Sequence, residues 1–231
     1  MDPFRALSTT ERTTLGRLRE RALTDRDALH DVLDAGLICH LGVVIDGTPV
    51  VLPTGYGRIG ETLYLHGSSA NRSLLAAAGA EVCVTVTQLD GLVCARSVFH
   101  NSMNYRSAVI YGPARLVTDA GERMDAVAAI TEHLIPGRWD NSRRPSRKEM
   151  AATAVLALEL AEASVKARSG GPSDDDEDYA LGYWAGVLPI RTVTGQPEPD
   201  PRLRSGIEVP AHISELAAPG SGAAAAGAGL P

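Results

Sequence analysis

The 231-residue chain has few aromatic residues, few lysines and few cysteines. Aromatic side chains make up 4% of it, and lysine occurs only at Lys148 and Lys166. The three cysteines, Cys39, Cys83 and Cys94, are odd in number, lack CxxC spacing and lie in apolar stretches. Buried free thiols are therefore expected, and neither a disulfide framework nor a zinc or other metal site.

The chain also lacks long apolar runs and a net positive charge. No run approaches the ~20 apolar residues that a membrane-spanning helix needs, and no basic segment followed by an apolar one begins the sequence. The net charge is −6 with a pI near 5.5, which does not fit nucleic acid or an anionic membrane as a partner. Hydrophobic residues at 44% and charged residues at 22% are ordinary globular values. We expect a cytoplasmic globular protein.

Composition divides the chain into three parts. Residues 1–21 are polar and arginine-rich, and we interpret them as an N-terminal arm. Residues 22–195 carry the strand and helix patterns and form the expected domain. Residues 196–231 are rich in Pro, Ala and Gly, with few side chains large enough to offset the entropy of ordering, so disorder is expected there.

Short β-branched segments joined by turn residues dominate the central part. Asp46-Gly47 and Asp90-Gly91 are typical hairpin turns, and Gly112-Pro113 fits a bulge or bend. Helices are expected after a cap at Thr24, over 71–78 and over 122–134. The expected strands cover 37–44, 49–54, 56–59, 62–66, 81–87, 92–97, 105–117, 155–160, 163–168 and 184–190. The pattern predicts a mainly β protein, a small antiparallel β-barrel with few helices.

One candidate site lies at 66–72, where an expected strand ends and a helix starts. Ser68 and Ser69 supply hydroxyl donors and Arg72 a guanidinium, so together with helix N–H groups they could hold a monophosphate. Simple helix capping by Ser69, with a solvated Arg72, explains the same residues, and from these residues alone it is the preferred interpretation, because serine-rich helix starts are common.

A second candidate lies at 96–107, which is dense in polar side chains. Tyr105 and Ser107 would share a strand face and could contact the polar edges of a planar heterocycle, although a hairpin loop accounts for the pattern too. His100 fits a solvated loop histidine. The acidic run 174–178 fits a solvated loop, because its carboxylates do not alternate as calcium ligands do. No catalytic residue is assigned.

Several separated motifs resemble, in order, those of the pyridoxamine 5′-phosphate oxidase-like proteins, in the flavin-nucleotide-binding branch that includes the nitroimidazole-resistance (Nim-type) proteins. The resemblance spans about 22–195. The motifs are Leu63–Ser68 with Arg72, Val82–Thr87, Asp90–Val93, Ala95–Ser97, Phe99-His100, Ser102–Ser107, Ala163–Lys166, Gly170–Pro172, Asp174-Asp175, Glu177–Tyr179 and Trp184–Pro189.

The resemblance implies a dimeric, antiparallel FMN-binding split β-barrel, with FMN in two grooves between the protomers of a homodimer. By position, the phosphate would be held by Ser68, Ser69 and Arg72. The isoalloxazine ring would be lined by Val51, Leu52, Pro53 and Thr54. Phosphate or ring-edge contacts would come from Tyr105, Arg106 and Ser107, with Trp184 packed near the ring. Asn71 replaces a histidine of the Nim-type relatives, so chemistry that needs that histidine is not expected.

Three functions remain open. The first is an FMN-dependent oxidoreductase that moves hydride or electrons from NAD(P)H to a small organic acceptor. The second is a flavin carrier or sensor without turnover. The third is a relative that binds the deazaflavin F420 or haem, with His40, His66 or His100 as an axial ligand.

Overall fold

The computed structural model describes residues 6–7 and 10–217. Over these residues ten strands form one antiparallel sheet with few helices around it, which confirms the mainly β prediction. The strands are β1 (Ala22–Leu23), β2 (Ile38–Ile45), β3 (Thr48–Ile59), β4 (Thr62–Ser68), β5 (Glu81–Cys94), β6 (Ser102–Pro113), β7 (Arg115–Leu116), β8 (Thr153–Glu159), β9 (Glu162–Arg168) and β10 (Gly186–Pro189). The α-helices are α1 (Arg26–Ala35), α2 (Arg72–Ala77), α3 (Ala120–Leu134), α4 (Arg147–Ala151) and α5 (Ala211–Leu216).

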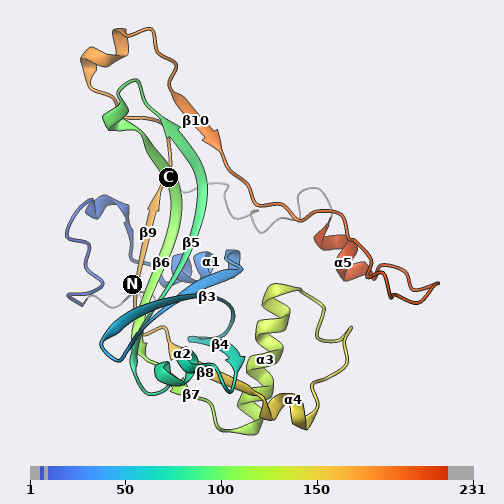
Figure 1. Ribbon diagram of the computed structural model, residues 1–231. Helices are drawn as coiled ribbons and strands as arrows, with labels where there is room; N and C mark the ends of the chain where they lie inside the picture. The colour runs from blue at the N-terminus through green and yellow to red at the C-terminus, as the bar shows by residue number, and fades with distance from the viewer. Residues whose placement is uncertain (1–5, 8–9, 218–231) are drawn as a thin grey trace.

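The sheet curls around one hydrophobic core. Its strand order is β1-β9-β6-β5-β2-β3-β4-β8-β7, and β10 pairs with β5 beside this path. Leu41, Val84, Ile110 and Leu158 are at most 1% exposed and meet in this core. Figure 1 shows β5 and β6 rising from the curled part as a long hairpin, with β10 beside its far end. The antiparallel pairing and the enclosed core give the split-barrel architecture that the sequence predicted.

The hairpin between β2 and β3 turns at Asp46-Gly47, as predicted. Both residues have positive φ, 51° and 76°, the combination that a type I′ turn requires. The strand after this turn is longer than expected. β3 pairs with β2 up to Gly55 and with β4 from Tyr56 onward, so the two expected strands 49–54 and 56–59 are one strand that changes partner.

The predicted turn at Asp90-Gly91 is wrong. β5 continues through these residues to Cys94, and its pairing with β6 shifts register between Leu89 and Gly91. The shift is a β-bulge, in which one extra residue stays within the strand. Asp90 is held there by Arg106, with oxygen to nitrogen distances of 2.8 and 3.0 Å. The turn that joins β5 to β6 lies instead at 95–101, around the 3-10 helix η2 (Val98–His100).

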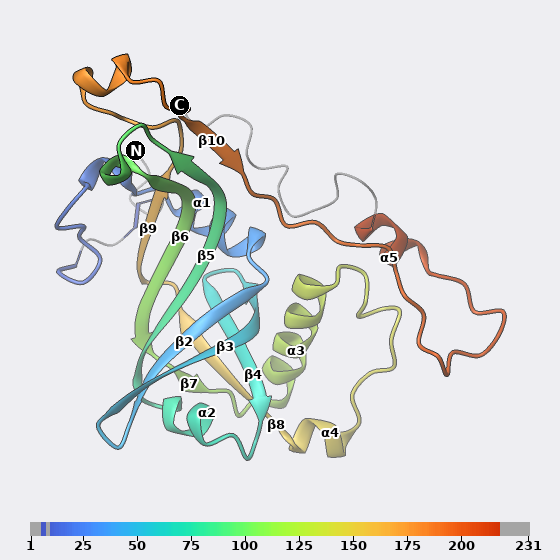
Figure 2. The same cartoon turned by 45° about the horizontal axis from the view of Figure 1, so that its top comes forward.

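Two helices pack on opposite faces of the sheet: α1 adds to the enclosed core, and α3 forms a second hydrophobic cluster with Tyr64 and Val155 on the other face. Asp25, and not the predicted Thr24, caps α1, because its side chain accepts a hydrogen bond from the Asp27 N–H. α3 lies against β3, β4 and β8 (Figure 2). A Cβ on Gly57 would come within 2.6 Å of the α3 backbone, so glycine at this position permits the close helix-to-strand packing.

After β10 the chain runs as an extended segment to α5, which lies beside the loop that follows α3 (Figure 1). α5 falls within the tail for which the composition predicted disorder, and residues 218–231 of that tail lie outside the described residues. Within the described part, no helix is long and apolar enough to cross a membrane. The three-part division of the chain and its cytoplasmic location stay predictions.

Candidate functional site

The face of the sheet turned away from the core presents His40 in its middle. Alternation along the strands points Val84 and Leu41 into the core and their neighbours outward. Across the sheet, Thr85 lies opposite His40, and His40 lies opposite Pro53. His40 is exposed and, among the described residues, makes no hydrogen bond or ion pair.

This outer face is unusually apolar for a surface. Ile38 is 55% exposed, Val44 is 62% exposed and Val51 is 64% exposed, all on β2 and β3. Grouped apolar side chains on a folded chain mark a binding surface for a ligand or a protein. The surface therefore offers an exposed apolar wall with one imidazole in it.

The four residues of β3 that were expected to line a ring lie on two different faces of the sheet. Val51 and Pro53 point outward and are exposed, whereas Leu52 lies opposite the buried Leu41 and is half-buried. Thr54 is also half-buried, and its hydroxyl donates to the Gly55 carbonyl at 3.2 Å. In this chain only Val51 and Pro53 can present side chains to a ring that lies on the outer face.

Tyr105 and Ser107 share the outer face, as predicted from their spacing. Both are half-buried, and Ser107 lies opposite Lys166 of β9. Arg106 points to the other face, where its guanidinium forms a two-pronged ion pair with Asp90. The hydrogen bonds that Arg106 donates to that carboxylate raise the pKa of Arg106. A contact between Arg106 and a ligand would have to form on the opposite side of the sheet from Tyr105.

The predicted phosphate cradle lies where β4 passes into α2. Asn71 caps this six-residue helix, and its side chain accepts from the N–H groups of Ser73 and Leu74. Two of the N–H groups at the start of α2 are thus engaged, and the cap is Asn71 and not the predicted Ser69. The donors that could meet a phosphate are the exposed side chains of Ser68, Ser69 and Arg72.

Arg72 is exposed and paired with the β2–β3 turn. Its guanidinium lies 2.5 Å from an Asp46 carboxylate oxygen, and both side chains are largely in solvent. Salt bridges this exposed contribute at most about 1 kcal/mol. The pair can therefore open at little cost when a stronger anion is present.

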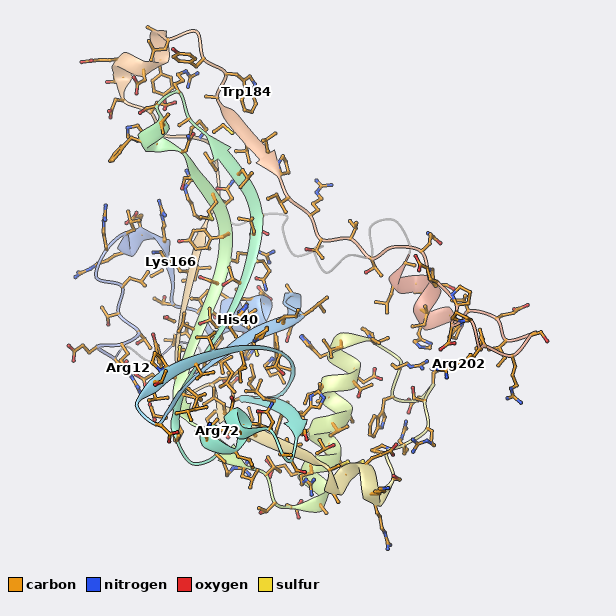
Figure 3. The ribbon with its side chains drawn as sticks, in the orientation of Figure 1. Arg12, His40, Arg72, Lys166, Trp184 and Arg202 are labelled. Carbon is orange, nitrogen blue, oxygen red and sulfur yellow. The ribbon has the colours of Figure 1, made fainter. Side chains whose placement is uncertain are left out.

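Trp184 lies apart from the other predicted residues. It precedes β10, is 66% exposed and lies over Gly186, where an added Cβ would meet the indole at 2.9 Å. Figure 3 shows Trp184 at one end of the molecule and Arg72 near the other, with His40 between them. A cavity of about 210 Å³ between residues 13–24 and β9 includes none of the predicted residues.

The histidines differ in what engages them. His133 lies 2.6 Å from the Gly36 carbonyl and His30 pairs with Glu61, so both rings are occupied. His66, on β4, is exposed and its side chain makes no hydrogen bond within the described ranges, and partial desolvation by its neighbours lowers its pKa. His66 therefore carries a neutral imidazole with an available lone pair at neutral pH.

A buried ion pair at the tip of the β5–β6 hairpin was not predicted. Asp174, from the run taken for a solvated loop, has an inaccessible side chain and binds the Arg96 guanidinium at 3.0 Å. It also accepts from the backbone N–H groups of Arg96 and Ser97. The run of identical charges gave no sign that its first member is buried, since Arg96 is 78 residues away in sequence.

Comparison with models of known protein families identifies one that matches this chain. Residues 25–167 match the model of the family described as pyridoxamine 5′-phosphate oxidase. Among curated proteins no match was found.

Two solved structures are similar over most of the chain. The flavocytochrome Anf3 of Azotobacter vinelandii is 41% identical with a TM-score of 0.86, over 90% of this chain and 98% of that one. An FAD and haem binding protein of Mycobacterium smegmatis is 40% identical with a TM-score of 0.82, over 85% and 97%.

A third structure is more distant. A protein of Bacteroides thetaiotaomicron described as a 5-nitroimidazole antibiotic resistance protein is 21% identical with a TM-score of 0.53, over 63% of this chain and 85% of that one. At this identity the likeness concerns the fold alone.

Proposed function

The chain belongs to the pyridoxamine 5′-phosphate oxidase family of split-barrel proteins, and on that premise we propose that it is a flavin-nucleotide-binding oxidoreductase. The flavin would accept hydride or electrons from NAD(P)H and pass them to a small organic acceptor. The observation that carries the proposal is the exposed apolar outer face of β2 and β3. Its apolar side chains suit a ring system, and polar groups on β6 lie at the side of it.

Residues on this face would contact the flavin ring, and Arg72 at the start of α2 would bind a phosphate. Val51 and Pro53 would form one wall of the ring site, and Tyr105 and Ser107 would meet its polar edge. Arg72 would release Asp46 and bind a phosphate, because a phosphate offers a guanidinium two charged oxygens in place of an exposed carboxylate. When bound, the flavin supplies the redox chemistry, and the chain supplies orientation and exclusion of water. No residue is assigned as a general acid.

A second copy of the chain would complete this site. Within one chain the outer face is open, and Trp184 stands far from it (Figure 3). Ile38, Val44 and Val51 are all more than half exposed, and covering them would favour association by the hydrophobic effect. We place the flavin between two such faces in a homodimer.

FAD is the flavin that we favour. The Mycobacterium smegmatis relative named for FAD and haem is 40% identical over most of both chains. The family resemblance alone suggested the smaller FMN. Extraction of the bound cofactor and chromatography against FAD, FMN and deazaflavin F420 standards distinguishes the three.

Haem is a second candidate ligand, favoured by two exposed imidazoles that have no polar partner among the described residues. His40 and His66 make no hydrogen bond or ion pair among the described residues, and a neutral imidazole nitrogen is a usual haem ligand. His40 stands in the apolar outer face, and partial desolvation lowers the pKa of the exposed His66, which favours its neutral form. His100 is less suitable, because its Nε2 lies 3.3 Å from a carboxylate oxygen of Asp175.

The absorbance spectrum of the purified protein tests both ligands. Flavin bands that bleach anaerobically with NADH or NADPH are expected, together with a Soret band when haem is present. His40→Ala or His66→Ala should remove the Soret band, with His212→Ala as the matched control. Flavin that neither nicotinamide reduces would contradict the oxidoreductase and favour a flavin carrier. Absence of any flavin would contradict the whole proposal.

A charge placed on the outer face tests where the flavin binds. Val51→Arg should abolish flavin binding and dimer formation together, because both would need the same apolar wall. Ile59→Arg is the matched control, since Ile59 is 44% exposed at the other end of the same strand. Light scattering and flavin content measure the two effects. If the Val51→Arg protein keeps its flavin, the flavin site does not lie on this face.

A further inference from the structure

Three metal-binding side chains meet at the tip of the β5–β6 hairpin, far from the outer face of β2 and β3. His100 ends the 3-10 helix η2, and Asp175 and Asp178 belong to the loop between β9 and β10, at the start of the 3-10 helix η3 (Asp176–Ala180). One ligand atom from each lies within 4.8 Å of the other two. Figure 1 shows the two segments side by side at the upper end of the molecule, and Figure 2 agrees.

The two segments are fixed to each other independently of the cluster. The buried Asp174 carboxylate binds the side chain and the N–H of Arg96. The Arg96 guanidinium in turn lies over the Tyr179 ring, 4.8 Å from its centre. Asp174 and Tyr179 are the sequence neighbours of Asp175 and Asp178, and Arg96 precedes His100 by four residues in the same turn. The ligand side chains are therefore held close to one another by neighbours that are not ligands.

One distance between ligand atoms in the cluster matches the distance between two ligand atoms of a coordinated ion. The Nε2 atom of His100 and the nearer Asp175 oxygen are 3.3 Å apart. Ligand atoms about 2.0–2.1 Å from a tetrahedral zinc ion stand roughly 3.3 Å from one another. A ligand atom of Asp178 lies within 4.8 Å of both. His100 and Asp178 are half-buried and Asp175 is exposed, so a fourth position would be open to water.

The charge of the loop also favours a cation. Residues 174–178 are all acidic, and Arg96 neutralises only the first of them. Throughout the ranges that the structure describes, no lysine or arginine pairs with the other four. His100 is the group that faces two of these carboxylates, and a divalent ion would neutralise both.

We infer that His100, Asp175 and Asp178 bind a divalent transition-metal ion of the zinc type, which fastens the β5–β6 hairpin to the β9–β10 loop. One imidazole and two carboxylates suit zinc better than magnesium, which prefers oxygen ligands alone. The ion would stabilise the tip that carries Trp184. The site is independent of the flavin and of the haem, and its three ligands come from a single chain.

Zinc titration of the full-length protein, first dialysed against EDTA and then freed of it, tests the site. One zinc ion per chain is expected by calorimetry. His100→Gln and Asp178→Asn should each weaken binding by at least about 10–100-fold, the typical loss when only an outer-shell partner of a metal ligand is removed. Asp176→Asn is the matched control, since it removes the same charge from the same loop without removing a ligand. Magnesium at equal concentration should not compete.

Two further readouts keep the result clear when a variant is less stable. Zinc should raise the melting temperature of the wild type and of Asp176→Asn, and should not raise that of Asp178→Asn. Zinc should also slow amide exchange at the hairpin tip and in the 174–180 loop. Equal zinc affinity in all variants, or no binding by the wild type, would overturn the site, and the cluster would then be a simple ion pair. Neither outcome bears on flavin content.

Discussion

Replacing Arg72 with alanine tests the assigned phosphate site most directly. The guanidinium is 78% exposed and holds only Asp46. A hydrogen bond to a charged partner contributes about 1.5–3 kcal/mol, and the exposed ion pair that has to open costs about 0–1 kcal/mol. Arg72→Ala should therefore weaken flavin binding by about 1–3 kcal/mol, which is roughly a 5- to 150-fold rise in Kd.

The same geometry predicts an opposite effect at Asp46. Asp46→Asn removes the competing carboxylate while keeping a residue that tolerates the positive φ of 51°. Flavin binding should become tighter, by up to about 1 kcal/mol or roughly fivefold. Calorimetric titration of flavin into the apoprotein measures both variants. Arg144→Ala, which breaks a comparable exposed pair with Asp140, is the control and should leave the Kd unchanged.

Two results would refute this reasoning. An unchanged Kd in Arg72→Ala would mean that the phosphate binds elsewhere. A Kd that rises in Asp46→Asn would mean that Asp46 supports the site, so that the ion pair is part of the binding geometry and does not compete with the ligand. The melting temperature of each variant should stay within a few degrees of the wild type, because both side chains are on the surface.

Three further predictions concern stability and reactivity. Tyr56→Phe should lower the free energy of unfolding by about 1–3 kcal/mol in urea titrations, because the buried hydroxyl lies 2.5 and 2.9 Å from two backbone carbonyls; a loss below 0.5 kcal/mol would contradict this. Burial raises the pKa of Cys39 to about 12, so iodoacetamide at pH 8 should label this thiol only after denaturation, as mass spectrometry would detect. Arg143 and Ser146 lower the pKa of Glu149 from 4.5 to about 2. This stabilisation is present above pH 4.5 and lost as the pH falls toward 2, so the melting temperature should drop more steeply there than in Glu149→Gln; parallel curves would count against it.

Local signals were sufficient where one short stretch of sequence decides the structure. The Asp46-Gly47 turn follows from two residues that tolerate positive φ, and the shared face of Tyr105 and Ser107 follows from the period of a strand. The same kind of signal failed at Asp90-Gly91. That pair has the residues of a hairpin turn, but Arg106 binds Asp90 and the pairing with β6 continues through a bulge.

Residues distant in sequence decided most of the candidate site. No local pattern shows that Arg72 meets Asp46, or that Asp174 is buried against Arg96, because each pair joins separate segments. The engagement of the α2 N–H groups by Asn71 could have been read from its position before the helix, since asparagine is a favoured cap. That the imidazoles of His40 and His66 have no polar partner among the described residues could be established only once the partners of the other histidines were known.

The sequence alone determined the antiparallel β class, the family resemblance and the types of side chain available for a phosphate and a flat ring. These depend on strand period, turn residues and ordered motifs, each of which acts over a short stretch of chain. The tertiary structure decided which of those side chains are free, which are already paired and which stand together. Pairing and burial are contacts between distant segments, and such contacts exist only after the sheet has closed around its core.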